Sequence, residues 1–161
     1  MPDPVAIVGT GLVGRAWAIA FARGGHPCRL FDAQAGAAAA ARERIGPLLD
    51  DMVEAGLIDA AEPILERIGI ADSPAEALDG ACRLQESAPE DVEVKRRLWS
   101  ELDRLADPAT ILASSTSAIV PSRFTETLEQ RQRCLVVHPL NPPYLIPAAE
   151  LVPAPWTSAA T

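Results

Sequence analysis

The feature that most constrains this chain is a glycine-rich loop between an apolar β-branched segment and an amphipathic segment. Residues 5–8 are Val-Ala-Ile-Val, a short apolar run that is typical of a buried parallel strand. Residues 9–14 are Gly-Thr-Gly-Leu-Val-Gly. Apolar side chains then recur at helical spacing up to about Arg23. A Gly-x-Gly-x-x-Gly loop in this context lets the backbone approach a diphosphate, and the free N–H groups of Leu12 and Val13 face the anion. We therefore predict a dinucleotide site.

Each glycine of this loop has a separate expected role: Gly9 allows the tight turn, Gly11 the approach to the diphosphate, and Gly14 close helix–strand packing. Asp32 ends the second predicted strand, 18 residues after Gly14. Its carboxylate can accept hydrogen bonds from the adenosine ribose and repels a 2′-phosphate, and neither of the next two residues is an arginine. These features favour NAD over NADP. By itself the loop also fits an FAD site, or a tight turn followed by an aspartate that caps a helix.

The rest of the chain alternates predicted strands with predicted helices. We expect further strands near residues 28–31, 68–70, 83–86, 111–113, 135–137 and 149–152. This pattern predicts an α/β fold: a doubly wound, mostly parallel sheet with helices on both faces and a helical hairpin after the second strand. Within the hairpin, Pro47 and the region of Gly56 should interrupt the helix. Residues 1–153 are expected to form one domain, and residues 154–161 a loose tail or the start of a linker.

Composition excludes several classes of function. The 161 residues carry 14 Lys and Arg against 22 Asp and Glu, a net charge of −8, which disfavours nonspecific binding to nucleic acid. No apolar run approaches the roughly 18–20 residues of a membrane span, and the N-terminus does not resemble a signal peptide. The three cysteines are far apart and lack zinc-ligand spacing. We expect a cytoplasmic protein with reduced thiols, no metal and a small-molecule substrate.

Polar residues follow the later predicted strands, at the edge where ligands bind in doubly wound sheets. His138 follows an apolar segment and precedes Pro-Leu-Asn-Pro-Pro; Ser117 lies 21 residues before it and Glu150 lies 12 residues after it. A neutral imidazole can take a proton from an alcohol, a carboxylate can orient it, and a hydroxyl can bind the substrate oxygen. Taken singly, each has a plainer interpretation: a structural histidine, a helix cap and a solvated carboxylate.

Three stretches carry a resemblance to a known family: residues 84–91 (Leu-Gln-Glu-Ser-Ala-Pro-Glu-Asp), residues 114–117 (Ser-Ser-Thr-Ser) and residues 138–153, which begin His-Pro-Leu-Asn-Pro-Pro-Tyr. With the glycine loop they make residues 5–153 similar to the Rossmann-type NAD-binding domain of the 3-hydroxyacyl-CoA dehydrogenase superfamily, within it to the lambda-crystallin and L-gulonate 3-dehydrogenase branch. The resemblance implies that His138 is the catalytic base paired with Glu150, and that Ser117 and Asn141 contact substrate and cofactor.

The resemblance also implies that Glu90 and Lys95 contact the nicotinamide side of NAD, although Lys95 could instead be an exposed helix charge.

This chain departs from the family pattern in two ways. The acyl-CoA enzymes carry a lysine-rich hairpin after the ribose aspartate, whereas residues 33–85 contain no lysine here, and seven carboxylates lie between Glu43 and Glu66. The family also continues into a helical domain that completes the site and forms a homodimer. We expect this chain alone to bind NAD but to turn over poorly.

These observations predict an NAD-dependent dehydrogenase, or its cofactor-binding half, that oxidises the 3-hydroxyl of a small hydroxy acid such as L-gulonate. An acyl-CoA such as 3-hydroxybutyryl-CoA and L-carnitine are alternative substrates within the family. A non-catalytic NAD(H)-binding or crystallin-like structural protein is the alternative of a different class. Retained Ser117, His138 and Glu150 favour the enzyme.

Overall fold

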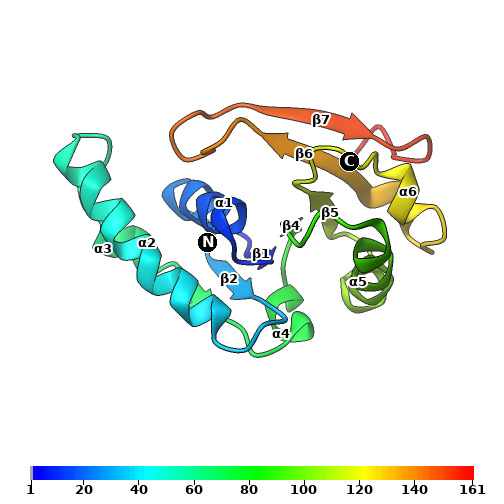
Figure 1. The fold of residues 1–161 in the computed structure, drawn as a ribbon, viewed down its shortest axis with the longest axis horizontal. Helices are drawn as coiled ribbons and strands as arrows, with labels where there is room; N and C mark the ends of the chain where they lie inside the picture. Colours follow the sequence, from blue (N-terminus) through cyan, green and yellow to red (C-terminus); the bar gives the residue numbers. More distant parts are fainter. Residues whose placement is uncertain (1) are drawn as a thin grey trace.

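A computed structural model describes residues 2–161, which form one seven-stranded sheet with strand order β3-β2-β1-β4-β5-β6-β7 (Figure 1). All neighbouring strands are parallel except β6 and β7, which are antiparallel. The strands are β1 Val5–Val8, β2 Cys28–Phe31, β3 Ile68–Ile70, β4 Arg83–Glu86, β5 Ile111–Ser114, β6 Cys134–Pro139 and β7 Ala149–Pro153. The doubly wound sheet predicted from the sequence is therefore confirmed.

Helices cover both faces of the sheet. The helices are α1 Leu12–Arg23, α2 Ala37–Glu54, α3 Glu62–Leu65, α4 Pro74–Leu78, α5 Val92–Leu105 and α6 Ser122–Thr125, with a 3-10 turn at Arg131–Arg133. One buried core joins α1, α2 and α3 to the sheet, and a second core on the opposite face includes side chains of α4, α5 and α6 (Figure 1). The strand order reverses between β1 and β4, and this switch point opens the crevice in which such sheets bind ligands.

The expected break at Pro47 is wrong, because α2 runs through it from Ala37 to Glu54. A proline removes one intrahelical hydrogen bond, here the bond to the carbonyl of Glu43. Pro47 lies on the exposed side, where water can serve that carbonyl, while Ile45 and Leu49 on the other side are fully buried and hold the helix on the core. The break near Gly56 is confirmed, since α2 ends at Glu54.

The C-terminal residues are not a loose tail. Ala154 is buried, and its N–H donates to the Thr157 hydroxyl at 2.8 Å, which in turn donates to the Cys134 carbonyl at 2.6 Å. The indole N–H of Trp156 donates to the Thr125 hydroxyl at 3.1 Å. The segment after β7 is thus hydrogen-bonded to the start of β6 and to α6.

Candidate active site

The loop between β1 and α1 needs its glycines for steric reasons that the structure makes explicit. Gly9 has φ +87°, and a Cβ there would lie 2.7 Å from the backbone of Ser87. A Cβ at Gly14 would lie 1.9 Å from the Gly9 carbonyl oxygen. At Gly11 a Cβ would meet no atom within 4 Å among the described residues, so this side of the loop faces open space. Two glycines close the loop, and the third leaves room for a ligand.

The start of α1 and Asp32 supply the groups a dinucleotide requires. Among residues 2–161 no side chain caps this helix, so its first N–H groups remain available for an anion. One Asp32 oxygen accepts from the Thr10 N–H at 2.7 Å and the Thr10 hydroxyl at 2.9 Å, and the other from the Gln34 N–H at 3.0 Å. The carboxylate is thereby fixed at the edge of the loop, and one acceptor position remains for a ribose hydroxyl. Thr10, which sequence reasoning passed over, orients it. The residues present fit NAD.

The second half of the site is built by the antiparallel pairing of β6 with β7. In that register His138 lies directly opposite Glu150, and the imidazole Nδ1 is 3.0 Å from a Glu150 carboxylate oxygen. The other ring nitrogen, Nε2, is 3.1 Å from the Ser117 hydroxyl, which follows β5. The structure therefore brings the three predicted residues together. One expectation needs correction: His138 lies within β6, which extends to Pro139, and not after the strand.

The partners of His138 assign its tautomer. An ionised carboxylate only accepts hydrogen bonds, so Nδ1–H donates to Glu150, and Nε2 is left as the acceptor of the Ser117 O–H. The unprotonated nitrogen is thus the one beside the serine. The Glu150 side chain is 70% exposed and that of His138 is 32% exposed, so a ligand can reach both. The arrangement can accept a proton at Nε2 and stabilise the resulting imidazolium.

Glu90 holds the loop that carries Ser117. One of its carboxylate oxygens accepts from the Ser117 N–H at 3.1 Å, the Ala118 N–H at 2.9 Å and the Thr116 hydroxyl. Partial burial by itself raises the pKa of Glu90, but these hydrogen bonds and the charge of Lys95 outweigh it and lower the pKa below its ordinary value. Glu90 is therefore ionised near neutral pH and fixes the serine loop. The predicted contact between Glu90 and NAD stays a prediction.

Lys95 lies inside the protein, so the interpretation as an exposed helix charge is wrong. Its ammonium donates to both oxygens of Glu86, at 2.8 and 3.0 Å, and both side chains are at most 1% exposed. Glu86 also accepts from the Trp99 indole at 3.1 Å and the Ser114 hydroxyl at 2.6 Å. This cluster ties β4 and β5 to α5 beneath the switch point. A direct contact between Lys95 and NAD stays a prediction.

A polar network below the crevice was missed by the sequence analysis. The Ser115 hydroxyl accepts from the Trp17 indole at 3.0 Å and from the Gln85 amide at 2.8 Å, and lies 3.0 Å from the Ser87 hydroxyl. With both lone pairs used, Ser115 must donate its proton to Ser87. The available signal was the pair Gln85 and Glu86, two polar residues within a strand predicted inside the sheet. The network joins α1 to the ends of β4 and β5.

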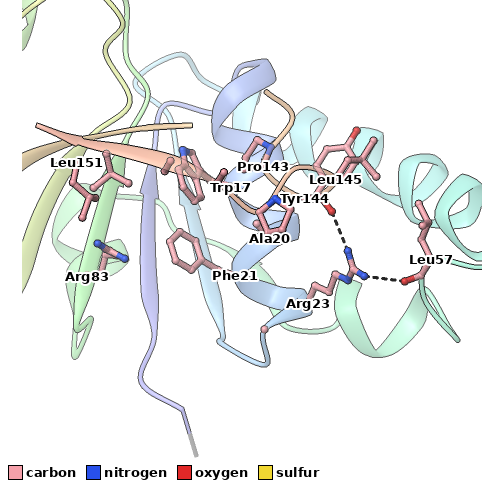
Figure 2. A pocket seen from close by; sticks show the side chains of 15 residues that line it. Trp17, Ala20, Phe21, Arg23, Leu57, Arg83, Pro143, Tyr144, Leu145 and Leu151 are labelled. Carbon is pink, nitrogen blue, oxygen red and sulfur yellow. Dashed lines mark hydrogen bonds between the residues drawn. The ribbon is translucent and has the colours of Figure 1, made fainter. Parts of the chain in front are cut away.

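A larger hollow lies elsewhere in the molecule (Figure 2). It measures about 840 Å³. It is bounded by α1, by β7 and by the segment that connects β6 to β7, and Trp17, Phe21 and Leu151 are among its lining residues. Neither His138 nor the glycine loop contributes to it. Asn141, which the resemblance places near the cofactor, is exposed in the loop after β6 and lines a smaller hollow beside Leu12.

None of the helices in residues 2–161 is long and apolar enough to cross a membrane.

Comparison with known proteins gives consistent matches. The sequence profile of the family described as 3-hydroxyacyl-CoA dehydrogenase, NAD binding domain, matches residues 4–161. The lambda-crystallin homolog of Mus musculus is 40% identical over 160 residues, which cover 98% of this chain and 50% of the relative. An L-carnitine dehydrogenase/betainyl-CoA thioesterase of Rhizobium sp is 36% identical over 158 residues, covering 97% of this chain and 31% of that protein.

Solved structures agree with the sequence matches. The 3-hydroxybutyryl-CoA dehydrogenase of Escherichia coli K12 superposes with a TM-score of 0.92 at 29% identity, over 98% of this chain and 34% of that one. The chain spans about half the length of the lambda-crystallin relatives that it matches.

Proposed function

Because this chain belongs to the family of NAD-binding domains of 3-hydroxyacyl-CoA dehydrogenases, we propose that it is the cofactor-binding half of an enzyme that oxidises the 3-hydroxyl of a small hydroxy acid. The observation that carries the proposal is the Ser117–His138–Glu150 arrangement, with an unprotonated Nε2 beside the serine hydroxyl. A structural histidine needs one stable partner, whereas this ring is oriented by a carboxylate, has a hydroxyl beside its basic nitrogen and is 32% exposed.

The residues divide the reaction between two halves of the site. NAD, when bound, supplies the acceptor for the hydride that leaves the carbinol carbon. Leu12 and Val13 offer N–H groups to the diphosphate, and Asp32 binds the ribose. His138 removes the hydroxyl proton at Nε2, so that the C–O bond becomes a carbonyl as the hydride departs. Ser117 hydrogen-bonds the substrate oxygen, and Glu150 stabilises the imidazolium.

The substrate class follows from the charge of the α2–α3 hairpin. Seven carboxylates between Glu43 and Glu66, with no lysine in residues 33–85, disfavour the phosphates of coenzyme A. L-Gulonate is the substrate we propose. L-Carnitine is the second candidate, since relatives named L-carnitine dehydrogenase are 35–36% identical over most of this chain. By resemblance, a homodimer formed through a helical C-terminal domain remains a proposal.

NADH formation tests the proposal. The assay uses this chain together with the helical domain that the resemblance implies. With that protein we expect L-gulonate to give a higher kcat/KM than L-carnitine or 3-hydroxybutyryl-CoA when absorbance of NADH is followed at saturating NAD. A higher kcat/KM with 3-hydroxybutyryl-CoA would show that the substrate is an acyl-CoA and not a small hydroxy acid. Tight NADH binding, measured by fluorescence titration, without turnover of any of the three would favour a binding or crystallin-like protein instead.

A further inference from the structure

A hollow of about 430 Å³ lies between α1, α2 and the loop after β6, and two arginines reach it. Its lining consists of Leu12, Arg15, Ala16, Arg44, Leu48, Asn141, Pro142 and Tyr144. Leu12 opens the helix of the dinucleotide loop, and Asn141 is three residues beyond His138. The hollow therefore lies where the two halves of the candidate site adjoin. Its size suits a small ligand.

Arg15 has no partner in the described part of the chain. Its side-chain Nε is buried without a hydrogen bond, and none of the ion pairs or side-chain hydrogen bonds formed among residues 2–161 involves Arg15 or Arg44. Arg83 and Arg133 also have a buried, unbonded Nε, but the Arg83 guanidinium lies 5.9 Å from the centre of the Phe21 ring, and other nitrogens of Arg133 bond to Asp103. Burial of Nε without an acceptor is unfavourable, while the terminal nitrogens of this half-buried guanidinium are not buried and can meet a ligand. Such a group is suited to an anion from outside.

We propose that Arg15, assisted by Arg44, binds the carboxylate of the substrate, which makes that substrate a free 3-hydroxy acid and not a thioester. The inference rests on the proposed function. In a 3-hydroxy acid only one carbon separates the carboxylate carbon from the carbinol carbon. An alcohol at His138 therefore keeps its carboxylate near the loop after β6, which carries Asn141. The planar fork of a guanidinium matches a carboxylate with two parallel hydrogen bonds.

The hollow is held in shape independently of the two arginines. Arg23 donates to the Tyr144 carbonyl at 3.0 Å and to the Leu57 carbonyl at 2.9 Å, and so fastens the loop after β6 to α1 and to the segment after α2 (Figure 2). Tyr144 is itself a wall of the hollow. A wall fixed before the ligand arrives reduces the entropy lost on binding.

Other anions have a better place elsewhere or lack the matching charge. The cofactor diphosphate is expected at the backbone N–H groups that begin α1, so it does not require the side chain of Arg15. In an acyl-CoA the position of the carboxylate is taken by a neutral thioester. L-Gulonate and L-carnitine both carry a carboxylate at this position, so the two candidates share the group that the arginines recognise.

Calorimetric titration of the NADH-loaded protein tests the proposal. The probes are L-gulonate and L-gulonamide, which is nearly isosteric but uncharged; NADH and free coenzyme A are titrated separately. We expect wild-type protein to bind the acid more tightly than the amide, and Arg15→Met to weaken acid binding roughly tenfold while the Kd values of the amide and NADH stay within about twofold. Arg44→Met, at an exposed position, should show a smaller loss. Arg97→Met, at an exposed position of α5, is the matched control.

Three outcomes would overturn the inference. An unchanged preference for acid over amide in Arg15→Met, with L-gulonate still oxidised, would show that the hollow does not read the carboxylate, and the proposed function would stand. Loss of NADH or coenzyme A binding with the acid preference intact would assign the arginines to a phosphate. Wild-type protein that oxidises 3-hydroxybutyryl-CoA and binds neither probe would refute the hydroxy-acid function and the carboxylate site together.

Discussion

Two acid–base pairs in this molecule differ in one property, their access to water. Glu86 and Lys95 are at most 1% exposed and meet beneath the switch point, while His138 and Glu150 are 32% and 70% exposed on the last two strands. The first pair is saturated by protein donors and has no free position for a ligand. The second leaves Nε2 facing a serine and the crevice. Similar charges thus stabilise the fold in one place and are available for chemistry in the other.

The largest effect should come from the buried pair. Lys95→Met leaves the Glu86 carboxylate without its counter-ion in the interior, and we expect a loss of about 3–5 kcal/mol in the free energy of unfolding. Urea denaturation measures it. Arg97→Met, exposed on the same helix, should change stability by no more than about 0.5 kcal/mol. A Lys95→Met protein as stable as wild type would show that the pair is not structural.

Replacing the imidazole of the exposed pair, His138 and Glu150, should lower the rate of the reaction and leave the stability of the fold unchanged. We expect His138→Gln to lower kcat at least about 100-fold, the scale of a lost general base, with NADH affinity near wild type. Steady-state kinetics and fluorescence titration give the two quantities. Turnover that does not change would remove His138 from the mechanism.

Glu150→Gln should have a smaller effect, because its side chain can still accept from Nδ1–H and only the negative charge is lost. An exposed ion pair is worth up to about 1 kcal/mol, so kcat should fall roughly fivefold. Urea denaturation should detect almost no change. A loss as large as that of His138→Gln would mean that the carboxylate does more than orient and stabilise the ring.

The smallest change concerns a carboxylate that faces the cofactor. Asp32→Ala removes the repulsion of a 2′-phosphate, and we expect the ratio of kcat/KM with NAD to that with NADP to fall several-fold. The variant also frees the Thr10 N–H and hydroxyl that Asp32 binds. If the preference for NAD did not move, Asp32 would not face the ribose.

Local patterns predicted much of the fold because they record local physics. The Val5–Val8 strand, the helix from Leu12 and the glycine loop between them follow from apolar periodicity and from backbone sterics. Pro47 shows the limit of this reasoning. A rule about one residue predicts a break, whereas the burial of Ile45 and Leu49 against the sheet keeps the helix continuous.

Sequence by itself determined which residues end up at the ligand-binding edge, since the carboxyl ends of parallel strands meet there whatever the loops do. Only the tertiary structure decided what each of them does. It placed Lys95 against Glu86 in the interior, set His138 opposite Glu150 through the β6–β7 register, and left Arg15 beside a hollow without a partner. Burial and hydrogen-bond partners are properties of residues distant in the chain, and no local pattern contains them.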